Sequence, residues 1–590
     1  MAKKNDNISL MNAFSVGAMD RERYSRSRRW NSECLTCASL LLAICAPTVA
    51  TAQSNSASRV RSEIFVGSPA ENYLRYLQSI GLVPLYPWSS RAFSPRELDR
   101  LIPKDSAHPW AARFRRSSDR LGPVEYDFIR PTSGVRFNTA FPYGSNDGPV
   151  WAGRGLTSSI VAGVALRWKP VSLTIAPMAF RAENSSFDML PTPNTGLAAF
   201  ADPLYGGVDR PQRFGASAYS QIDPGQSTLR VDLPFVSGGV STANMGWGPG
   251  SEYPLILGNN AAGFPHAFVG TSEPLNIFIG NVHAKVMWGE LFQSRFSLVQ
   301  GPTRYISRAE PGTTRFTTGI VATFQPRGVT GLEIGASRFF HSIWPVSGIP
   351  RSYLTKVFQG ILKKDLPLDV PDDPRFPPGL ETQGISDNQL ISAFLRWVLP
   401  HSGFEVSGEY AREDHAYDLR DLLQEPDHSR FYTFGMRKVF RHSPAALTAG
   451  RVEIINFQLP QLSRYRGEGE IYFHGLLRQG HTNRGQLLGA NVGVGSAAGS
   501  TVAVDHYSRN GSWTASWVRD VNRENGSYLL LGVRNPRSMD VNHALGFEMT
   551  RFLEAFDVTG GLTFVRDFNR NFTRDVNNLN ATLSVSYKLR

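Results

Sequence analysis

The stretch Asn578-Leu579-Asn580-Ala581-Thr582-Leu583-Ser584-Val585-Ser586-Tyr587-Lys588-Leu589-Arg590 closes the sequence and decides the fold class. Every odd-numbered residue up to Leu589 is apolar, and every even-numbered residue is polar. Because successive side chains of a strand point to opposite faces, this period of two gives one apolar and one polar face. A strand of this length with these two faces is typical of the wall of a transmembrane β-barrel.

The same alternation recurs upstream and is punctuated by turn signals. Residues 160–168 alternate, Lys169-Pro170 predicts a turn, and 171–175 resume the pattern. Asn510-Gly511 predicts a two-residue hairpin turn, and Asn525-Gly526 predicts the next reversal. The strand region extends from about 126 to the end of the chain, which at roughly 25 residues per strand predicts about 16–18 strands. We therefore expect a mainly β chain that forms a large transmembrane antiparallel barrel.

The composition restricts the function classes. The 590 residues carry a formal net charge of +12, and the arginines are scattered singly through strand-like segments. A nucleic-acid binder concentrates Lys and Arg on one element, so no nucleic-acid partner is expected. The mild positive charge favours an acidic glycan or lipopolysaccharide as an anionic partner.

The N-terminal 52 residues have the layout of an export signal. Five arginines between positions 21 and 29 precede the apolar stretch 35–50, and Ala50-Thr51-Ala52 is followed by polar sequence. We expect a signal peptide over 1–52, cleaved after Ala52, and a final location in the cell outer membrane. Cys34, Cys37 and Cys45 all lie inside this segment. The remainder therefore has no thiolate metal site, and we expect neither a metal nor a cofactor.

A short helical region is predicted between the signal peptide and the barrel. Ser68-Pro69-Ala70-Glu71 and Ser94-Pro95-Arg96-Glu97 are both capping boxes with proline at the first helical position. A third short helix is expected from Pro109 to Arg116. The predicted domains are the signal peptide 1–52, a periplasmic helical segment 53–125 and the barrel 126–590.

Two long interruptions of the strand pattern are rich in Pro, Gly and Asp. They cover residues 183–212 and 351–386 and predict long loops, the second with a short helical piece over 353–363. Asp369, Asp372 and Asp373 of the second loop suit either a calcium ion or ordinary solvated loop charge.

A series of motifs in the barrel region closely resembles the capsule-assembly (Wzi-type) family of outer-membrane proteins. The motifs occur in the order expected for that family and cover nearly all of the chain after the signal peptide. They are Arg213-Phe214-Gly215, Ser227-Thr228-Leu229-Arg230, Gly246-Trp247-Gly248-Pro249-Gly250, Leu255-Ile256-Leu257-Gly258-Asn259-Asn260, Gly263-Phe264-Pro265, Glu409-Tyr410, His474-Gly475 and Gln479 to Gly489. Two positions depart from the family pattern, since Gly246 stands where a second tryptophan is common and the chain ends without a terminal aromatic residue.

The resemblance implies a lectin-like barrel of about eighteen strands with a periplasmic helical bundle. Proteins of this family help to hold capsular or extracellular polysaccharide at the cell surface. The implied partners are this polysaccharide, outer-membrane lipid or lipopolysaccharide, and the barrel-assembly and export machinery during biogenesis.

Eight residues are candidates for glycan contact, and each also has a structural interpretation. Trp247 offers a flat apolar face and Asn259-Asn260 offer paired donors and acceptors, but glycine, proline and asparagine also stabilise a luminal loop. Trp288 and Glu290 near a strand end suit a glycan platform or an interfacial anchor. His474, His481 and Arg484 suit an acidic saccharide or a polar lumen wall.

Two other functions remain open at this stage. A diffusive porin for sugars or ions shares the fold and differs in having an open lumen. An outer-membrane hydrolase is suggested only by the cluster Glu409, Glu413, Asp414 and His415, which also fits a charged strand end. Since the common hydrolase and nucleotide-binding motifs are absent from the sequence, we expect a protein that is not an enzyme and has no catalytic residues.

Overall fold

The computed structural model describes residues 61–104, 106–114, 119–204, 207–297, 314–344, 348–362, 364, 387–458, 471–474, 477–523 and 539–588. All of them belong to the compact unit Ala57–Arg590. Several sequence predictions lie outside the described residues: the signal peptide with its cleavage site and cysteines, the turn at Asn525-Gly526, and the three aspartates at 369–373.

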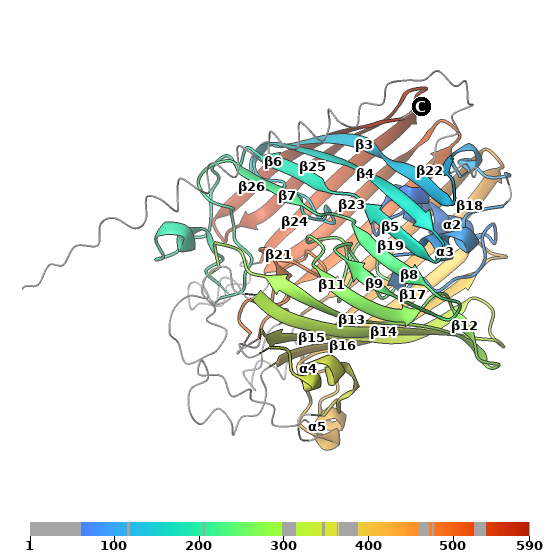
Figure 1. Cartoon of the computed structure of the whole chain (residues 1–590). Coiled ribbons are helices and arrows are strands. Elements are labelled where there is room, and N and C mark those ends of the chain that lie inside the picture. Colours follow the sequence, from blue (N-terminus) through green and yellow to red (C-terminus); the bar gives the residue numbers. More distant parts are fainter. Residues whose placement is uncertain are drawn as a thin grey trace, which may run out of the picture. The chain divides into compact units, whose positions relative to one another are not determined.

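The described strands form one closed antiparallel barrel (Figure 1). Its N-terminal strand β3 pairs with its C-terminal strand β26, so the sheet has no free edge. Eighteen strands result when β5 with β6, β7 with β8, and β11 with β12 are each taken as one interrupted strand, which confirms the predicted barrel. The strands are β3 (Val124–Asn138), β4 (Gly155–Trp168), β5 (Val171–Ile175), β6 (Met178–Ala182), β7 (Tyr219–Asp223), β8 (Thr228–Asp232), β9 (Val236–Ser241), β11 (His266–Thr271), β12 (Leu275–Asn276), β13 (Gly280–Phe292), β14 (Thr314–Pro326), β15 (Leu332–Ile343), β16 (Asp387–Leu399), β17 (Phe404–Glu413), β18 (Arg430–Ser443), β19 (Ala446–Asn456), β22 (Ala498–Ser508), β23 (Gly511–Arg523), β24 (Asp540–Phe552), β25 (Phe556–Arg570) and β26 (Arg574–Tyr587); the short β2 (Asp119–Leu121) pairs with β3.

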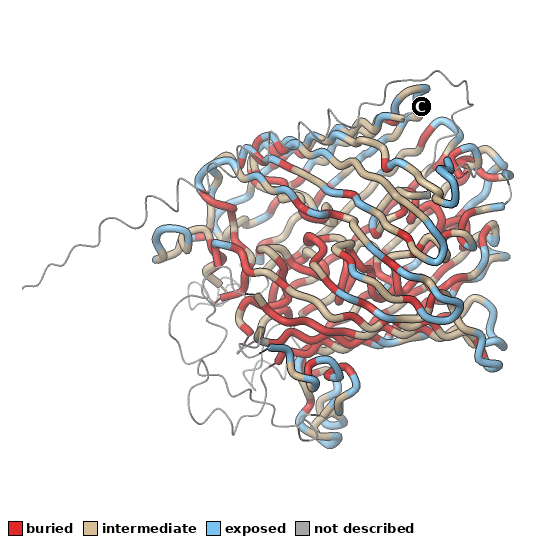
Figure 2. Tube along the Cα trace, viewed as in Figure 1, coloured by how far each residue is buried: buried red, intermediate tan, exposed pale blue. Residues whose placement is uncertain are grey.

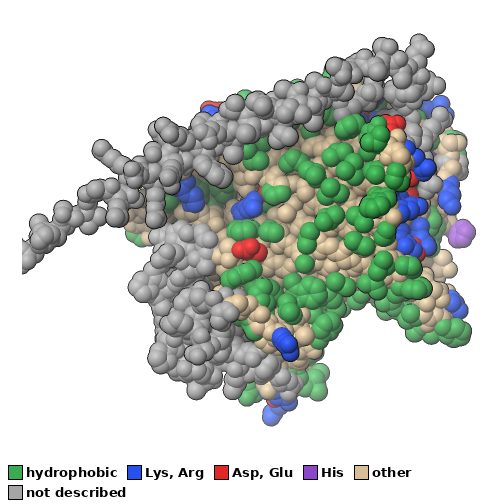
Figure 3. Space-filling view, viewed as in Figure 1, with side chains coloured by type: hydrophobic (Ala, Val, Ile, Leu, Met, Phe, Trp, Pro, Cys, Tyr) green, Lys and Arg blue, Asp and Glu red, His purple; other side chains and the backbone are tan. Residues whose placement is uncertain are grey.

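The side chains of β26 point to the two faces that the alternation of the C-terminal sequence predicts. On β26, Leu579 and Leu583 are 44% and 46% exposed on the outer face, whereas Asn578 and Asn580 are buried on the inner face. Apolar side chains cover the middle of the outer wall in Figure 3, and Lys and Arg gather toward one end. The barrel therefore has the apolar outer band that a lipid environment requires.

The two mouths of the barrel differ in the length of their connections. Short connections, such as Lys169-Pro170 and 400–403, join strands at one mouth, the short-turn mouth, and long segments leave the strands at the other, the long-loop mouth. The turn predicted at Asn510-Gly511 is wrong by one residue. Ser508 pairs with Gly511, so the two-residue loop is Arg509-Asn510. Glycine is instead the first paired residue of β23, where its φ of +147° is one that other residues rarely adopt.

The helical segment is short and its caps follow the predicted boxes. It contains η1 (Arg61–Glu63), α2 (Pro69–Ser79), α3 (Pro95–Leu101) and η2 (Ala111–Arg113), and β1 (Ser90–Arg91) pairs with β10 (Gly246–Trp247). Ser94 and Glu97 form a complete capping box. Ser68 caps α2, but the Glu71 carboxylate accepts from the amide of Gly67, so that box is incomplete. The third helix is a single 3₁₀ turn, shorter than the predicted range 109–116.

Buried ion pairs attach α2 to the inner wall near the short turns. Arg75 donates to Glu405 of β17 at 2.9 and 2.5 Å, and Arg396 of β16 donates to the other oxygen of the same carboxylate at 2.7 Å. Both guanidinium groups and the carboxylate are fully buried. The backbone amides of residues 88 and 89 donate to Glu333 of β15. Removing one partner would leave a buried charge uncompensated, so this network fixes where the helices sit.

Two inserted segments fill the lumen, and we call them the plug: residues 242–265, and residues 471–474 and 477–497 with β20 (Thr482–Asn483) and β21 (Gln486–Leu487). Their apolar side chains, among them Trp247, Ile256 and Tyr472, form one buried cluster with inward residues of the wall such as Phe339 and Phe431. The buried residues accordingly gather inside the barrel in Figure 2. The barrel therefore encloses a hydrophobic core.

The described parts of the two predicted long loops contain short helical turns. In the loop at 183–212, the described residues hold η3 (Gly196–Phe200). The predicted helical piece at 353–363 begins earlier and is shorter, with α4 (Arg351–Thr355) followed by η4 (Lys356–Phe358); α5 (Leu419–Gln424) follows β17. Among the described residues, no helix has both the length and the apolar character needed to cross a membrane.

A single charged substitution tests which face of β26 points to lipid. Leu579→Arg places a guanidinium in the middle of the apolar band, and we expect it to lower the free energy of unfolding by about 2–4 kcal/mol in lipid. Thr573→Arg, in the exposed hairpin before β26, is the control and should change stability little. Urea unfolding in lipid vesicles, followed by tryptophan fluorescence, measures both, and equal effects would contradict the assigned faces.

Candidate functional site

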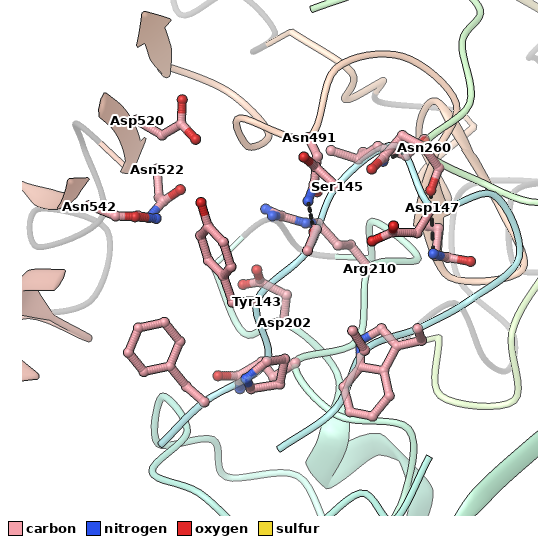
Figure 4. A pocket seen from close by; sticks show the side chains of 18 of the residues that line it. Tyr143, Ser145, Asp147, Asp202, Arg210, Asn260, Asn491, Asp520, Asn522 and Asn542 are labelled. Atoms are coloured by element: carbon pink, nitrogen blue, oxygen red, sulfur yellow. Dashed lines mark hydrogen bonds between the residues drawn. The ribbon is translucent and has the colours of Figure 1, made fainter. Parts of the chain in front are cut away.

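The plug separates two cavities. The larger, which we call the long-loop cavity, has a volume of about 270 Å³ and lies at the long-loop mouth. Its lining comes from the β3–β4 connection, from Asp202 and residues 210–212, from the plug, and from the ends of β23 and β24. In Figure 4, Tyr143, Asp520, Asn522 and Asn542 lie on one side of this space, and Ser145, Asp147, Asn260 and Asn491 lie on the other.

Carboxylates outnumber cations in the lining of the long-loop cavity. Five acidic side chains line it, Asp147, Asp202, Glu252, Asp520 and Asp540, against the three arginines Arg210, Arg523 and Arg570. Arg523 is paired with Asp202 at 2.9 Å, and Arg570 is paired with Asp567 at 2.8 Å. These two cations are already neutralised by the protein, so the cavity offers mainly oxygen acceptors and amides.

Polar atoms that could contact a ligand remain in the cavity. The side-chain oxygen of Asn542 is buried and has no hydrogen-bond partner in the described part of the chain. Burial, with a smaller contribution from Asp520, raises the pKa of Tyr143, so its phenol stays neutral. Phe141 and Trp151 add aromatic surface to the same wall. Hydroxyl, amide, carboxylate and aromatic groups in one concave space suit a ligand rich in hydroxyl groups.

The sequence analysis did not identify these residues, although it contains one signal for them. The tripeptide Asp-Val-Asn occurs at 520–522 and at 540–542, at the long-loop ends of two neighbouring strands, and also at 575–577, which does not line the cavity. Because residues two apart on a strand share a face, the first two copies each turn an acid and an amide into the lumen. The β3–β4 connection gave no comparable signal, since its place in the cavity depends on the closure of the barrel.

Trp247 lies inside the plug core. The side chain is fully buried, and its ring packs edge-on against Phe339. Gly319 of β14 leaves the space that the indole occupies, because a Cβ there would lie 2.5 Å from the ring. The structure thus gives Trp247 a packing role.

Asn259 and Asn260 hydrogen-bond to backbone groups that hold the plug loops together. The Asn259 amide donates to the carbonyl of Asn146 at 2.9 Å, and the Asn260 amide donates to the carbonyl of Leu487 at 2.9 Å. Of the eight predicted site residues, only Asn260 also lines the long-loop cavity.

Trp288 and Glu290 belong to the other side of the wall. They share a face of β13 with Val286, opposite the buried Lys285 and Met287. The Trp288 indole donates to the carbonyl of Leu354 at 2.9 Å. Their position outside the lumen separates them from the other predicted residues.

His474, His481 and Arg484 lie on one plug segment but in different surroundings. The His474 ring accepts from the amide of Leu477. His481 is fully buried, donates to the carbonyl of Ile256 at 2.6 Å, and accepts from His341 at 2.8 Å. Burial lowers the pKa of His481 to about 3, so its ring is uncharged at neutral pH. Arg484 pairs with Asp223 at 2.5 Å.

The acidic cluster considered for catalysis does not assemble at a cavity. Glu409 and Glu413 are buried against the plug, where the Glu409 carboxylate approaches the backbone of Gly248 and Glu413 accepts from the amide of Asn388 at 2.8 Å. Neither cavity is lined by Asp414 or His415. Among the described residues, no group of three or more His, Cys, Asp or Glu side chains is placed to hold a metal ion.

Comparison of the sequence with family models and with curated proteins gives no match. Solved structures share the fold. The structure of Wzi, an outer-membrane protein involved in group 1 capsule assembly in Escherichia coli and a carbohydrate-binding β-barrel, matches with a TM-score of 0.58 and 12% identity, over 89% of this chain and 99% of that one.

Two further solved structures match less well. A BenF-like porin from Pseudomonas fluorescens has a TM-score of 0.37 at 8% identity, covering 78% of this chain and 98% of that chain. OccAB3 of Acinetobacter baumannii has a TM-score of 0.35 at 8% identity, again covering 78% of this chain and 98% of that chain.

The packing role of Trp247 can be measured directly. Trp247→Ala removes the largest apolar side chain of the plug and should cost about 3–5 kcal/mol of unfolding free energy, because the closed wall cannot collapse around the space. Trp288→Ala, on the outer face, is the matched control and should cost less. Denaturant unfolding in detergent compares them, and a stable Trp247→Ala protein that no longer binds glycan would instead support the contact role.

Proposed function

We propose that this protein is a plugged outer-membrane barrel that holds capsular or extracellular polysaccharide at the cell surface, as a member of the capsule-assembly (Wzi-type) family. The observation that carries the proposal is the arrangement of the lumen. A hydrophobic core closes it, and a polar, partly aromatic cavity remains at one mouth. The shared fold with Wzi, together with the ordered motifs, supports the same assignment.

The orientation in the membrane follows from the two mouths. Outer-membrane barrels have short periplasmic turns and long extracellular loops. On this rule the long-loop cavity faces the outside, where a surface glycan lies, and the segment 53–125 with its helices faces the periplasm. A cleavable signal peptide over 1–52 and the barrel-assembly machinery would deliver the chain, with lipopolysaccharide around its outer leaflet half.

The cavity lining favours a neutral glycan over an acidic one. Two of its three arginines are paired with protein carboxylates, whereas Tyr143 and Asn542 present uncharged hydrogen-bonding atoms. The neutral hydroxyl groups of a glycan can form hydrogen bonds with Tyr143 and Asn542 without breaking an ion pair of the protein. This differs from the acidic partner that net charge alone favoured, because net charge does not report the charge of one cavity.

The porin alternative makes a different prediction about current. Because the plug core closes the lumen, purified protein in a planar bilayer should give little or no ohmic conductance. An open porin would give stable current steps. Such steps at neutral pH, with protein that runs as a folded barrel on a gel, would contradict the proposal.

The holding role is tested in cells. Deletion of the gene should move polysaccharide from the cell-bound to the shed fraction, and the wild-type gene should restore retention. An unchanged cell-bound fraction of polysaccharide after deletion would contradict the proposal.

The cavity is tested by removing single polar groups. Tyr143→Phe should weaken binding of the purified polysaccharide roughly 2- to 12-fold, as expected for one neutral hydrogen bond of about 0.5–1.5 kcal/mol. Asn542→Ala should act in the same direction. Asn281→Ala, near the short-turn end of β13, is the control, and equal affinity of all four proteins would place binding elsewhere.

A further inference from the structure

The second cavity lies on the other side of the plug, and we call it the short-turn cavity. Its volume is about 150 Å³. The helical segment lines it through Phe65, Phe93 and Leu98, the plug through Met245, and the inner wall through strands from β3 to β13. The long-loop cavity shares none of these residues. It is therefore a separate space that the polysaccharide proposal does not use.

A buried lysine without a partner lines this cavity. Lys285 of β13 is 6% exposed, and within the described residues its ammonium makes no hydrogen bond or ion pair. Its nearest aromatic neighbour is Phe268, whose ring centroid lies 5.5 Å from the nitrogen. Burial of an ammonium without an anion in direct contact is unfavourable, so the site can accommodate an anionic group beside the lysine.

The carboxylates near Lys285 are engaged by other groups. Asp232 pairs with Arg230 at 2.6 Å. Glu97 accepts from the amide of Ser94 at 2.7 Å and from Tyr86 at 3.0 Å. Their ion pairs are with Arg230 and His283, and neither carboxylate contacts the ammonium directly.

A second cation stands beside the same ring. The Arg230 guanidinium carbon lies 5.3 Å from the centroid of Phe268, so the phenyl group has a guanidinium and an ammonium within contact range. The two carboxylates that line the cavity also have partners, since Asp127 accepts from Ser62 at 2.6 Å and Glu125 pairs with Arg120 at 2.8 Å. Because Asp232 already neutralises Arg230, the unpaired positive charge of this corner comes from Lys285, and Phe268 gives the corner an apolar floor.

We propose that the short-turn cavity binds a small amphipathic carboxylate, with its anionic head on Lys285 and a compact apolar body against Phe268, Phe93 and Met245. The volume fits a body of about one benzene ring, since a cavity of about 150 Å³ holds benzene in an engineered protein. With short turns at the periplasmic side, the ligand comes from the periplasm. This site is independent of the glycan site.

Benzoate is the probe, and benzyl alcohol, which has the same ring but no charge, is the control ligand. Isothermal titration calorimetry on the full chain in non-ionic detergent should show saturable one-to-one binding of benzoate, at least 10-fold tighter than binding of benzyl alcohol. Lys285→Met should weaken benzoate binding at least 10-fold, whereas Lys438→Met, at a half-buried position on β18 outside this cavity, should leave it unchanged. Equal binding of the two probes, equal binding by Lys285→Met, or no binding to the wild-type protein would overturn the proposal.

A second measurement locates the ligand and does not need the lysine variant to fold. With methyl-labelled methionine, benzoate should shift the resonance of Met245 and leave that of Met549, on the outer face of β24, in place. A benzoate titration that moves neither resonance, or moves both, would place the ligand outside the short-turn cavity and contradict the assignment.

Discussion

The pairing of β26 with β3 is the constraint on which the rest of the structure depends. It joins Asn580 to Asn138 and Ser586 to Thr132, and it turns a long meander into a sheet without edges. In lipid, every backbone polar group of the wall needs a partner within the protein, and closure supplies it. Closure of eighteen strands also creates a lumen too wide for wall side chains alone to fill. The chain fills it with its own segments.

The way in which the lumen is filled determines where chemistry can occur. The plug core joins Trp247 and Tyr472 to wall residues such as Phe339, so the middle of the lumen is apolar. The network of Arg75, Glu405 and Arg396 attaches the helical segment at the short-turn mouth. What remains open is a polar cavity on one side of the plug and, on the other side, a smaller cavity with an apolar floor and a buried lysine. A barrel built this way is suited to holding a ligand at its mouth, and poorly suited to conducting it.

The sequence predicted the parts of the fold that depend on local periodicity and missed those that depend on closure. The alternation of residues 578–588 and the capping box at Ser94 are local patterns, and both predictions are confirmed. Trp247 was a candidate for glycan contact because it offers a flat apolar face. In the folded barrel its indole is buried in the space left by Gly319 of β14, a residue distant in the sequence. The long-loop cavity joins residues from 143 to 542, and no local pattern could bring these together.

Hydrogen exchange with purified surface polysaccharide tests the central claim most directly, because it reports where the glycan sits on the folded barrel. The account predicts slower exchange on glycan addition in 141–152 and 485–491, which line the long-loop cavity, and no change around α2 or in the turn at 509–510. Protection confined to the short-turn mouth, or unchanged exchange at saturating polysaccharide, would contradict it.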